Sequence, residues 1–226
     1  MIMQTQHLNM AAVDNHSAEL LVILVPAGQT GFPSQAYPPS LETLIEHYKK
    51  MGDWHSESKY LLCINPPEFK ALRILLVNTN LDIVKADAKR ISNVVSDVLE
   101  QLNQAKADIV MPPSLPGGEL LIQALFHASY KFSDYKTKTS RREEISVALL
   151  VSDDSLDESL DYARALHNGM SRTRDLANMP GNLCTPAYFA ECALALDEQF
   201  ATISTDILDE AQLTELGMDA YLAVGR

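Results

Sequence analysis

The sequence lacks the short motifs that most often carry chemistry. Its six histidines include no pair spaced i, i+4 and no H-E-x-x-H, so no zinc-binding helix of that type is expected. Its three cysteines, Cys63, Cys184 and Cys192, fit neither a zinc motif nor a disulfide framework, and we expect free thiols. Neither G-x-G-x-x-G nor the Walker pattern occurs, which counts against a nucleotide-binding domain.

Positive charge and long apolar runs are also scarce. The formal net charge is −12, and the acidity is concentrated in residues 141–226, with 6 Lys+Arg against 16 Asp+Glu. Residues 1–140 are nearly neutral, with 12 against 14. This balance argues against bulk attraction to nucleic acid or anionic lipid. No run approaches the length of a membrane-spanning helix, and no basic and apolar leader opens the chain, so we expect a cytoplasmic protein without a membrane segment.

What is present is an alternation of apolar runs and helical patterns. With 226 residues and 46% hydrophobic content, the chain can form one large domain, or one domain and part of another. Short apolar runs predict strands at 19–25, 60–64, 72–77, 109–111 and 145–151, with a weak edge strand within 1–18. Helical spacing predicts helices at 41–51, 82–104 and 118–129, the first capped by Ser40 and ended by Gly52. Such alternation predicts an α/β sheet with helices on both faces.

The second part of the chain begins with a long helix, predicted from about residue 155 to 178. Its expected buried stripe consists of Leu156, Leu160, Ala163, Met170 and Leu176. Beyond it, the patterns predict helices at 186–199 and 209–216 and strands at 203–207 and 220–224. Two strands cannot make an independent core, so we expect a unit that has only begun, with unpaired strand edges.

Between these helices lies a junction, residues 171–191. Pro180 cannot continue the first helix, and Gly181-Asn182 supplies turn residues. Thr185 is a good N-cap and Pro186 suits the first position of the next helix. The local interpretation is a helix, a short turn and a second helix.

Three other stretches could carry chemistry, but each has a simpler structural explanation. Gly117-Gly118 is explained by a turn and a helix start, rather than by a phosphate site. The acidic run 153–161 suits the start of a helix and lacks the glycine of a calcium loop. The aromatic and lysine residues of 130–138 form too short a run for a single-strand nucleic-acid site in an acidic chain.

A resemblance to a known family joins several of these stretches. Arg174-Asp175-Leu176, Asn178, Pro180, Asn182 and Thr185-Pro186 resemble the "RDL-N-P-N–TP" segment of leucyl aminopeptidases, metallopeptidase family M17. Residues 130–138 resemble a segment near the end of that family's N-terminal domain, although Gln123-Ala124 stands where the family usually has Glu-Gly. Residues 208–226 resemble the family's "L-E-L-G-M–L-V-G" run. The resemblance extends over about residues 120–226.

The resemblance implies an architecture and an activity. It implies a macro-domain-like mixed sheet in 1–152, a linking helix and junction in 153–183, and the truncated beginning of the catalytic domain in 184–226. Enzymes of this family remove N-terminal amino acids from peptides with two divalent metals, usually zinc or manganese, and the resemblance implies a hexamer. Their Asp, Glu and Lys ligands lie beyond the point that matches Val224-Gly225. We therefore assign no catalytic, cofactor-binding or metal residue here, and expect the chain alone to be inactive.

Two alternatives stay open at this point. The chain could be a non-enzymatic, macro-domain-like binding or assembly module that acts in oligomerisation or on DNA, with DNA disfavoured by the acidic charge. It could also be an unrelated nucleotide-binding α/β domain, which rests on fold analogy alone. Substrate preference, metal identity and the reason for a truncation do not follow from the sequence.

Overall fold

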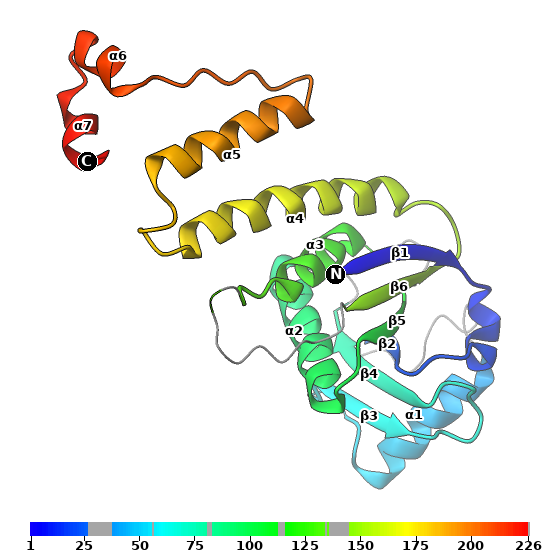
Figure 1. Cartoon of the computed structure of the whole chain (residues 1–226). Coiled ribbons are helices and arrows are strands. Elements are labelled where there is room, and N and C mark those ends of the chain that lie inside the picture. Colours follow the sequence, from blue (N-terminus) through cyan, green and yellow to red (C-terminus); the bar gives the residue numbers. More distant parts are fainter. Residues whose placement is uncertain are drawn as a thin grey trace. The chain divides into compact units, whose positions relative to one another are not determined.

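The protein is described here by a computed structural model, which covers residues 1–26, 38–55, 57–80, 83–112, 116–133, 135 and 145–225. The chain divides into two units, Met1–Asn168 and Gly169–Arg226. The division falls inside one long helix, α4 (Asp157–Asn178) (Figure 1). Within the described residues, no helix is both long and apolar enough to cross a membrane.

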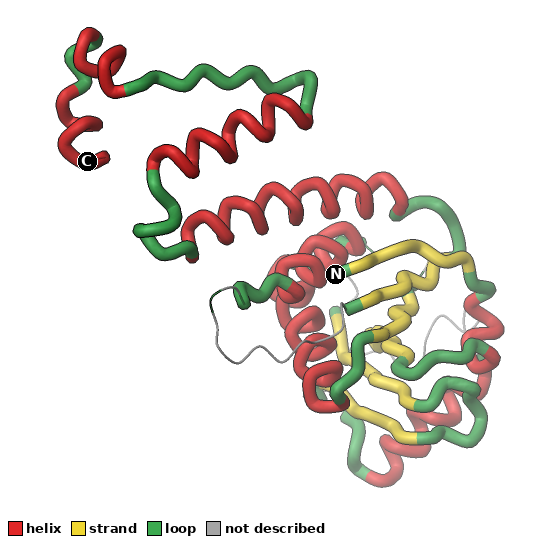
Figure 2. Tube along the Cα trace, in the orientation of Figure 1, coloured by secondary structure: helices red, strands yellow, loops and turns green. Residues whose placement is uncertain are grey.

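Unit 1 is built on one six-stranded sheet with the order β1-β6-β5-β2-β4-β3 (Figure 2). All neighbouring strands are parallel except β3 and β4, which are antiparallel. The strands are β1 (Ile2–His7), β2 (Leu21–Pro26), β3 (Tyr60–Ile64), β4 (Arg73–Thr79), β5 (Lys106–Val110) and β6 (Ser146–Val151). The predicted mixed α/β sheet is therefore confirmed, and the polar N-terminal segment supplies an edge strand.

Strand β2 lies in the interior of the sheet and is buried on both of its faces. Leu21 and Ile23 pack in one apolar cluster with η1 (Met10–Asn15) and α1 (Pro39–Met51). Val22 and Leu24 pack in a second cluster with α2 (Lys85–Leu102), α3 (Gly118–Ser129) and the start of α4. Since successive side chains point to opposite faces, the continuous apolar run requires cover on both sides. Helices on both faces were predicted and are observed.

Two helix ends illustrate how local chemistry sets the boundaries. Gly52 closes α1 with a φ of 84°, as predicted. The predicted cap at Ser40 is wrong, because α1 already begins at Pro39, and the Ser40 hydroxyl instead donates to Asp14 Oδ2 at 2.9 Å. Proline suits the first turn of a helix, where its missing N–H costs no bond, so the helix starts two residues before the predicted start at Leu41.

The buried stripe predicted for α4 is only partly correct. Leu160 and Ala163 are buried in unit 1, and Leu156 packs against the same cluster. Met170 is 38% exposed, and Leu176 is only partly buried. The stripe is therefore buried only in the first half of the helix, which is the half that belongs to unit 1.

Unit 2 contains the end of α4, α5 (Pro186–Gln199), α6 (Glu210–Glu215) and α7 (Asp219–Gly225). Both strands predicted there are wrong, and so is the expectation of unpaired strand edges. Residues 203–207 adopt no regular element, and the Thr205 hydroxyl and N–H instead bond to α5. Residues 220–224 are helical, because Ala and Leu favour a helix and no neighbouring strand in the described part offers them a partner.

Candidate functional site

The junction between α4 and α5 forms as its residues predict. The Met179 N–H donates to the Asp175 carbonyl, and the N–H groups of Leu183 and Cys184 both donate to the Pro180 carbonyl at 2.9 Å. The turn is thus closed by backbone bonds around Pro180. The next helix starts at Pro186, and the Thr185 hydroxyl accepts a hydrogen bond from the Tyr188 N–H at 3.2 Å. This is the N-cap geometry that the sequence predicts.

Other side chains of unit 2 also bond to backbone N–H groups at or near helix ends. The Thr205 N–H donates to Asp197 Oδ2 at 2.8 Å, which ties the segment after α5 back to that helix. Asp209 and Gln212 form a reciprocal capping box at the start of α6, with bonds of 2.8 and 2.9 Å. Polar side chains therefore cap the starts of α5 and α6.

The acidic run 153–161 is occupied by protein donors. Asp157 accepts a bond from the Thr5 hydroxyl at 2.7 Å, Asp154 lies 2.7 Å from His7 Nε2, and Asp161 pairs with Arg164 at 2.8 Å. Hydrogen bonds from the Ser155 side chain and N–H lower the pKa of Asp153. The run attaches the start of α4 to β1. Its acids in the first turn interact favourably with the helix dipole, which agrees with the interpretation of the run as a helix start.

Gly117 and Gly118 form a turn and a helix start. Gly117 has a φ of 81°, and a Cβ placed on it would lie 2.0 Å from the Ile83 carbonyl oxygen. The Ile83 N–H also donates to the Pro116 carbonyl at 2.9 Å. The glycine is needed because two backbone segments, one before α2 and one before α3, approach too closely for a side chain.

Two neighbouring titratable groups of unit 1, Cys63 and Tyr48, have raised pKa values. Burial raises the pKa of the Cys63 thiol. The pKa of Tyr48 is raised mainly by burial and, to a smaller extent, by a hydrogen bond with Cys63. Both groups are therefore held in the neutral form. Cys184 and Cys192 are partly exposed, and all three cysteines are free thiols, as expected.

Sequence reasoning missed two polar clusters of unit 1. His16 Nε2 lies 2.6 Å from Asp108 Oδ2 and joins the end of η1 to β5. At the carboxyl end of β4, Asp87 accepts a bond from Asn80 Nδ2 at 2.6 Å, and Arg90 donates to the Asn78 carbonyl at 2.6 Å. The spacing Asp87 to Arg90 is a visible i, i+3 signal, whereas no local pattern connects His16 with Asp108.

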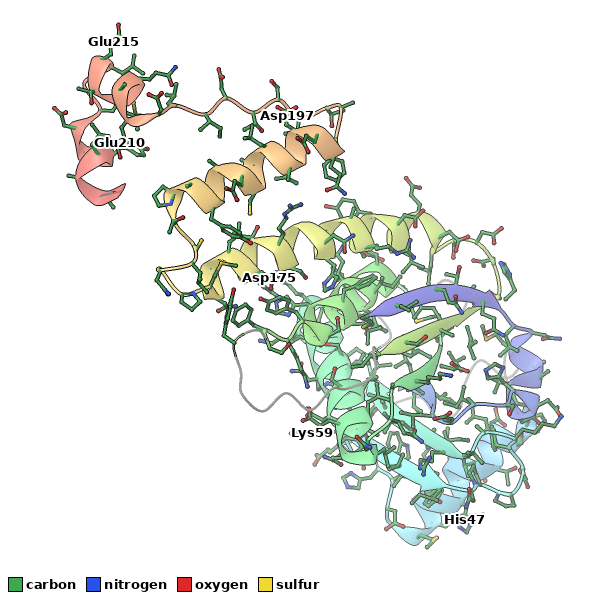
Figure 3. The ribbon with its side chains drawn as sticks, viewed as in Figure 1. His47, Lys59, Asp175, Asp197, Glu210 and Glu215 are labelled. Carbon is green, nitrogen blue, oxygen red and sulfur yellow. The ribbon has the colours of Figure 1, made fainter. Side chains whose placement is uncertain are left out.

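The residues described here do not fit a metal centre. Among them, no group of three or more His, Cys, Asp or Glu side chains could hold a metal ion. The labelled acids Asp197, Glu210 and Glu215 come from different elements of unit 2 or point apart (Figure 3). We therefore derive no hydrolytic step through residues of this chain.

The aromatic and lysine stretch lies only partly within the described residues. Lys131 Nζ pairs with Glu100 at 3.0 Å, and the rings of Phe132 and Tyr135 lie 6.2 Å apart in a tilted arrangement. Residue 134 and residues 136–138 lie outside the description. The observed lysine is thus engaged by a carboxylate, and this stretch gives no support to a nucleic-acid site.

Comparison with known proteins gives matches that cover nearly the whole chain. Residues 171–226 match the family model described as "Cytosol aminopeptidase family, catalytic domain". A cytosol aminopeptidase of Pseudomonas aeruginosa PAO1 is 29% identical over 221 residues, which are 91% of this chain and 45% of the relative. A probable cytosol aminopeptidase of Legionella pneumophila (strain Corby) is 32% identical over 145 residues, 64% of this chain and 29% of the relative.

A solved structure shares the fold. It is a mutant of tomato leucine aminopeptidase, with a TM-score of 0.73 and 18% identity, and the match covers 99% of this chain and 47% of that one. The chain thus spans about half the length of the proteins that it matches. The family match begins inside the junction at residue 171, where the quoted residues first indicated the same family. On these matches, residues 171–226 are similar to the catalytic domain of the cytosol aminopeptidase family, and 91% of the chain is similar to cytosol aminopeptidases at 29% identity.

Proposed function

We propose that this chain supplies part of a leucyl aminopeptidase, a dimetal exopeptidase that removes N-terminal amino acids from peptides. In this proposal residues 1–152 are the N-terminal domain, 153–183 are the linking helix and junction, and 184–226 are the beginning of the catalytic domain. The observation that carries it is the match of residues 171–226 to the family's catalytic domain. The junction geometry around Pro180 and Thr185 supports the same assignment.

The hydrolytic chemistry would come from two divalent ions, manganese or zinc, which polarise the scissile carbonyl and activate a water. We propose that their ligands belong to the portion of the family's catalytic domain that lies outside the match. Lys131, Asp153 and Arg174 take no catalytic part in this scheme. Lys131 pairs with Glu100, and Asp153 accepts bonds from Ser155, so both side chains already have structural partners.

Three finer assignments belong to the same proposal. The working enzyme is a homohexamer that acts on peptides, and it works in the cytoplasm. The relatives' name, cytosol aminopeptidase, supports the last point. A DNA partner is not part of the proposal, because the net charge of −12 opposes binding to a polyanion.

The test is an aminopeptidase assay of the pure chain with a leucyl peptide and added manganese or zinc. We expect no release of leucine, while the P. aeruginosa cytosol aminopeptidase, assayed beside it, serves as the positive control. Sustained, metal-dependent release by the pure chain would overturn the assignment of the ligands to the unmatched portion. A chelator control separates such release from a contaminating metal-independent peptidase.

A second measurement is the intact mass of the native polypeptide in cells of the source organism. A product much heavier than 25.0 kDa would place this sequence within a larger aminopeptidase polypeptide. A product of 25.0 kDa would require that the catalytic residues come from a separate chain, or that the chain acts only in binding or assembly.

A further inference from the structure

Strand β3 ends the sheet on the side opposite to β1 (Figure 1). The Asn65 N–H donates to the Leu72 carbonyl at 2.9 Å, and the Asn78 N–H donates to the Lys59 carbonyl at 3.1 Å. Both residue pairs continue the register in which Cys63 faces Ile74. In an antiparallel pair, hydrogen-bonded and non-bonded positions alternate, so residues 59, 61, 63 and 65 bond to β4.

The intervening residues Tyr60, Leu62 and Ile64 therefore direct their N–H and C=O groups away from the sheet. In the described part of the chain, no strand pairs with this outer edge. The side chains of Tyr60 and Ile64 are 42% and 65% exposed, and Leu62 packs against the core. The five residues of β3 carry no charge. An uncharged strand with an open edge is a template for another strand.

The opposite edge, β1, is protected in ways that β3 is not. Arg164 donates to the Met3 carbonyl at 3.0 Å, which occupies an outward-facing backbone acceptor. Thr5 and His7, the next two residues of the same parity, bond through their side chains to Asp157 and Asp154 of the α4 region. Charged and polar groups thus cover one edge of the sheet, so the open edge of β3 is not a general feature of this fold.

We propose that β3 is a homodimerisation strand, which pairs antiparallel with β3 of a second copy about a two-fold axis at Leu62. Leu62 then faces Leu62 of the other copy, and Tyr60 faces Ile64 in two symmetric pairs. In this register the outward-facing residues of the two strands form three hydrogen-bonded pairs. Each pair exchanges two backbone hydrogen bonds, which gives six bonds in all. The result is one continuous sheet through two copies of unit 1.

We infer that the strand that pairs with β3 is β3 of a second copy, because the open edge is complementary to itself. The two-fold register places an aromatic residue opposite a β-branched one, which is a favourable cross-strand pair. It places Lys59, labelled in Figure 3, opposite Asn65 and so opposes no like charges between residues 59 and 65. Any slip by one residue would direct Leu61 and Cys63, whose backbone groups already bond β4, toward the partner.

The first experiment compares two double variants of the full chain by sedimentation equilibrium over a range of concentrations. In Tyr60→Lys with Ile64→Lys, each lysine faces a lysine of the other copy. In Tyr60→Glu with Ile64→Lys, each pair joins opposite charges. We expect the dilysine variant to raise the dimer dissociation constant at least about tenfold relative to the Glu/Lys variant. Both changed positions are exposed, so both variants should keep the far-UV circular dichroism spectrum of the wild type.

The second readout is amide hydrogen exchange at single-residue resolution as a function of protein concentration. Protection should rise with concentration at Tyr60, Leu62 and Ile64, while Leu61 and Cys63, whose amides bond β4, should not change. Equal association of the two double variants would overturn the proposal, as would a wild type whose alternate amides stay unprotected at all concentrations. Association of both variants without the alternating protection would assign dimerisation to another surface.

Discussion

The backbone contact at Gly117 allows a prediction with a matched control in the same unit. Gly117 and Gly52 have nearly the same backbone conformation, with φ of 81° and 84°. A Cβ at Gly117 would lie 2.0 Å from the Ile83 carbonyl oxygen, whereas nothing lies within 4 Å of one at Gly52. Comparing Gly117→Ala with Gly52→Ala therefore separates the cost of the clash from the cost of positive φ.

The expected magnitudes follow from these two terms. Positive φ costs an alanine about 1–2 kcal/mol, and the stiffer unfolded chain returns about 0.5 kcal/mol, so Gly52→Ala should lose about 1 kcal/mol of unfolding free energy. In Gly117→Ala the Ile83 carbonyl must also move by at least 1 Å, since real Cβ atoms essentially never approach within 3.0 Å. This movement disturbs the bond from the Ile83 N–H to the Pro116 carbonyl, worth about 1 kcal/mol, and the packing of buried Ile83. We expect a total loss of about 3 kcal/mol or more.

The assay is urea unfolding followed by the fluorescence of Trp54, the single tryptophan, which is 4% exposed in unit 1. The midpoint should fall in both variants, with little change in slope, and should fall much further in Gly117→Ala. Losses that agree within about 0.5 kcal/mol would refute the reasoning, because the backbone approach at Ile83 would then have no energetic consequence.

Two further predictions concern a cap and a buried thiol. Thr185→Ala removes the acceptor of the Tyr188 N–H and should destabilise α5 by about 1 kcal/mol, seen as faster amide exchange in that helix. Thr173→Ala is its control, since the Thr173 hydroxyl only bonds back to the Gly169 carbonyl within α4, and equal effects of the two changes would contradict the capping role. Burial raises the pKa of Cys63 above its ordinary value of 9.0, so its stabilising contribution is full below pH 9 and is lost as pH rises through the folded pKa. The unfolding free energy should therefore fall less steeply above pH 9 in Cys63→Ala than in the wild type, and parallel curves from urea titrations would show that the thiol stays protonated equally in both states.

The parts of the fold that the sequence predicts well depend on local signals. The apolar run around Leu21 requires cover on both faces, and Gly52 ends a helix because it tolerates positive φ. The pairing of β1 with β6 joins residues more than 140 positions apart, and no local pattern encodes it. The failed strand at 220–224 has the same cause, since its residues suit either state and the absence of a partner strand in the described part decides for the helix.

In the candidate site, too, features set by neighbouring residues could be predicted from the sequence, and contacts between distant residues could not. The junction could be predicted because Pro180, Thr185 and Pro186 each act on their own neighbours. The contact of His16 with Asp108 could not, because it depends on how η1 packs across the sheet. The family resemblance rested on residues of this junction, and residues 171–226 match the catalytic-domain model of the same family.

In unit 2 the helices have well-formed caps but bury few apolar side chains. Its helices start at well-formed caps, yet Leu222 is the one buried hydrophobic residue among those described in it, while Phe189, Phe200 and Tyr221 are 56%, 44% and 69% exposed. Most helical stability in folded proteins comes from burying an apolar face, and isolated helices as short as α5 are marginal in water. The caps at Thr185 and Asp209 therefore carry a larger share of the local stability here than they would in a packed domain. It follows that Thr185→Ala should raise amide exchange along the whole of α5, rather than in its first turn alone, until some partner covers the exposed aromatic side chains.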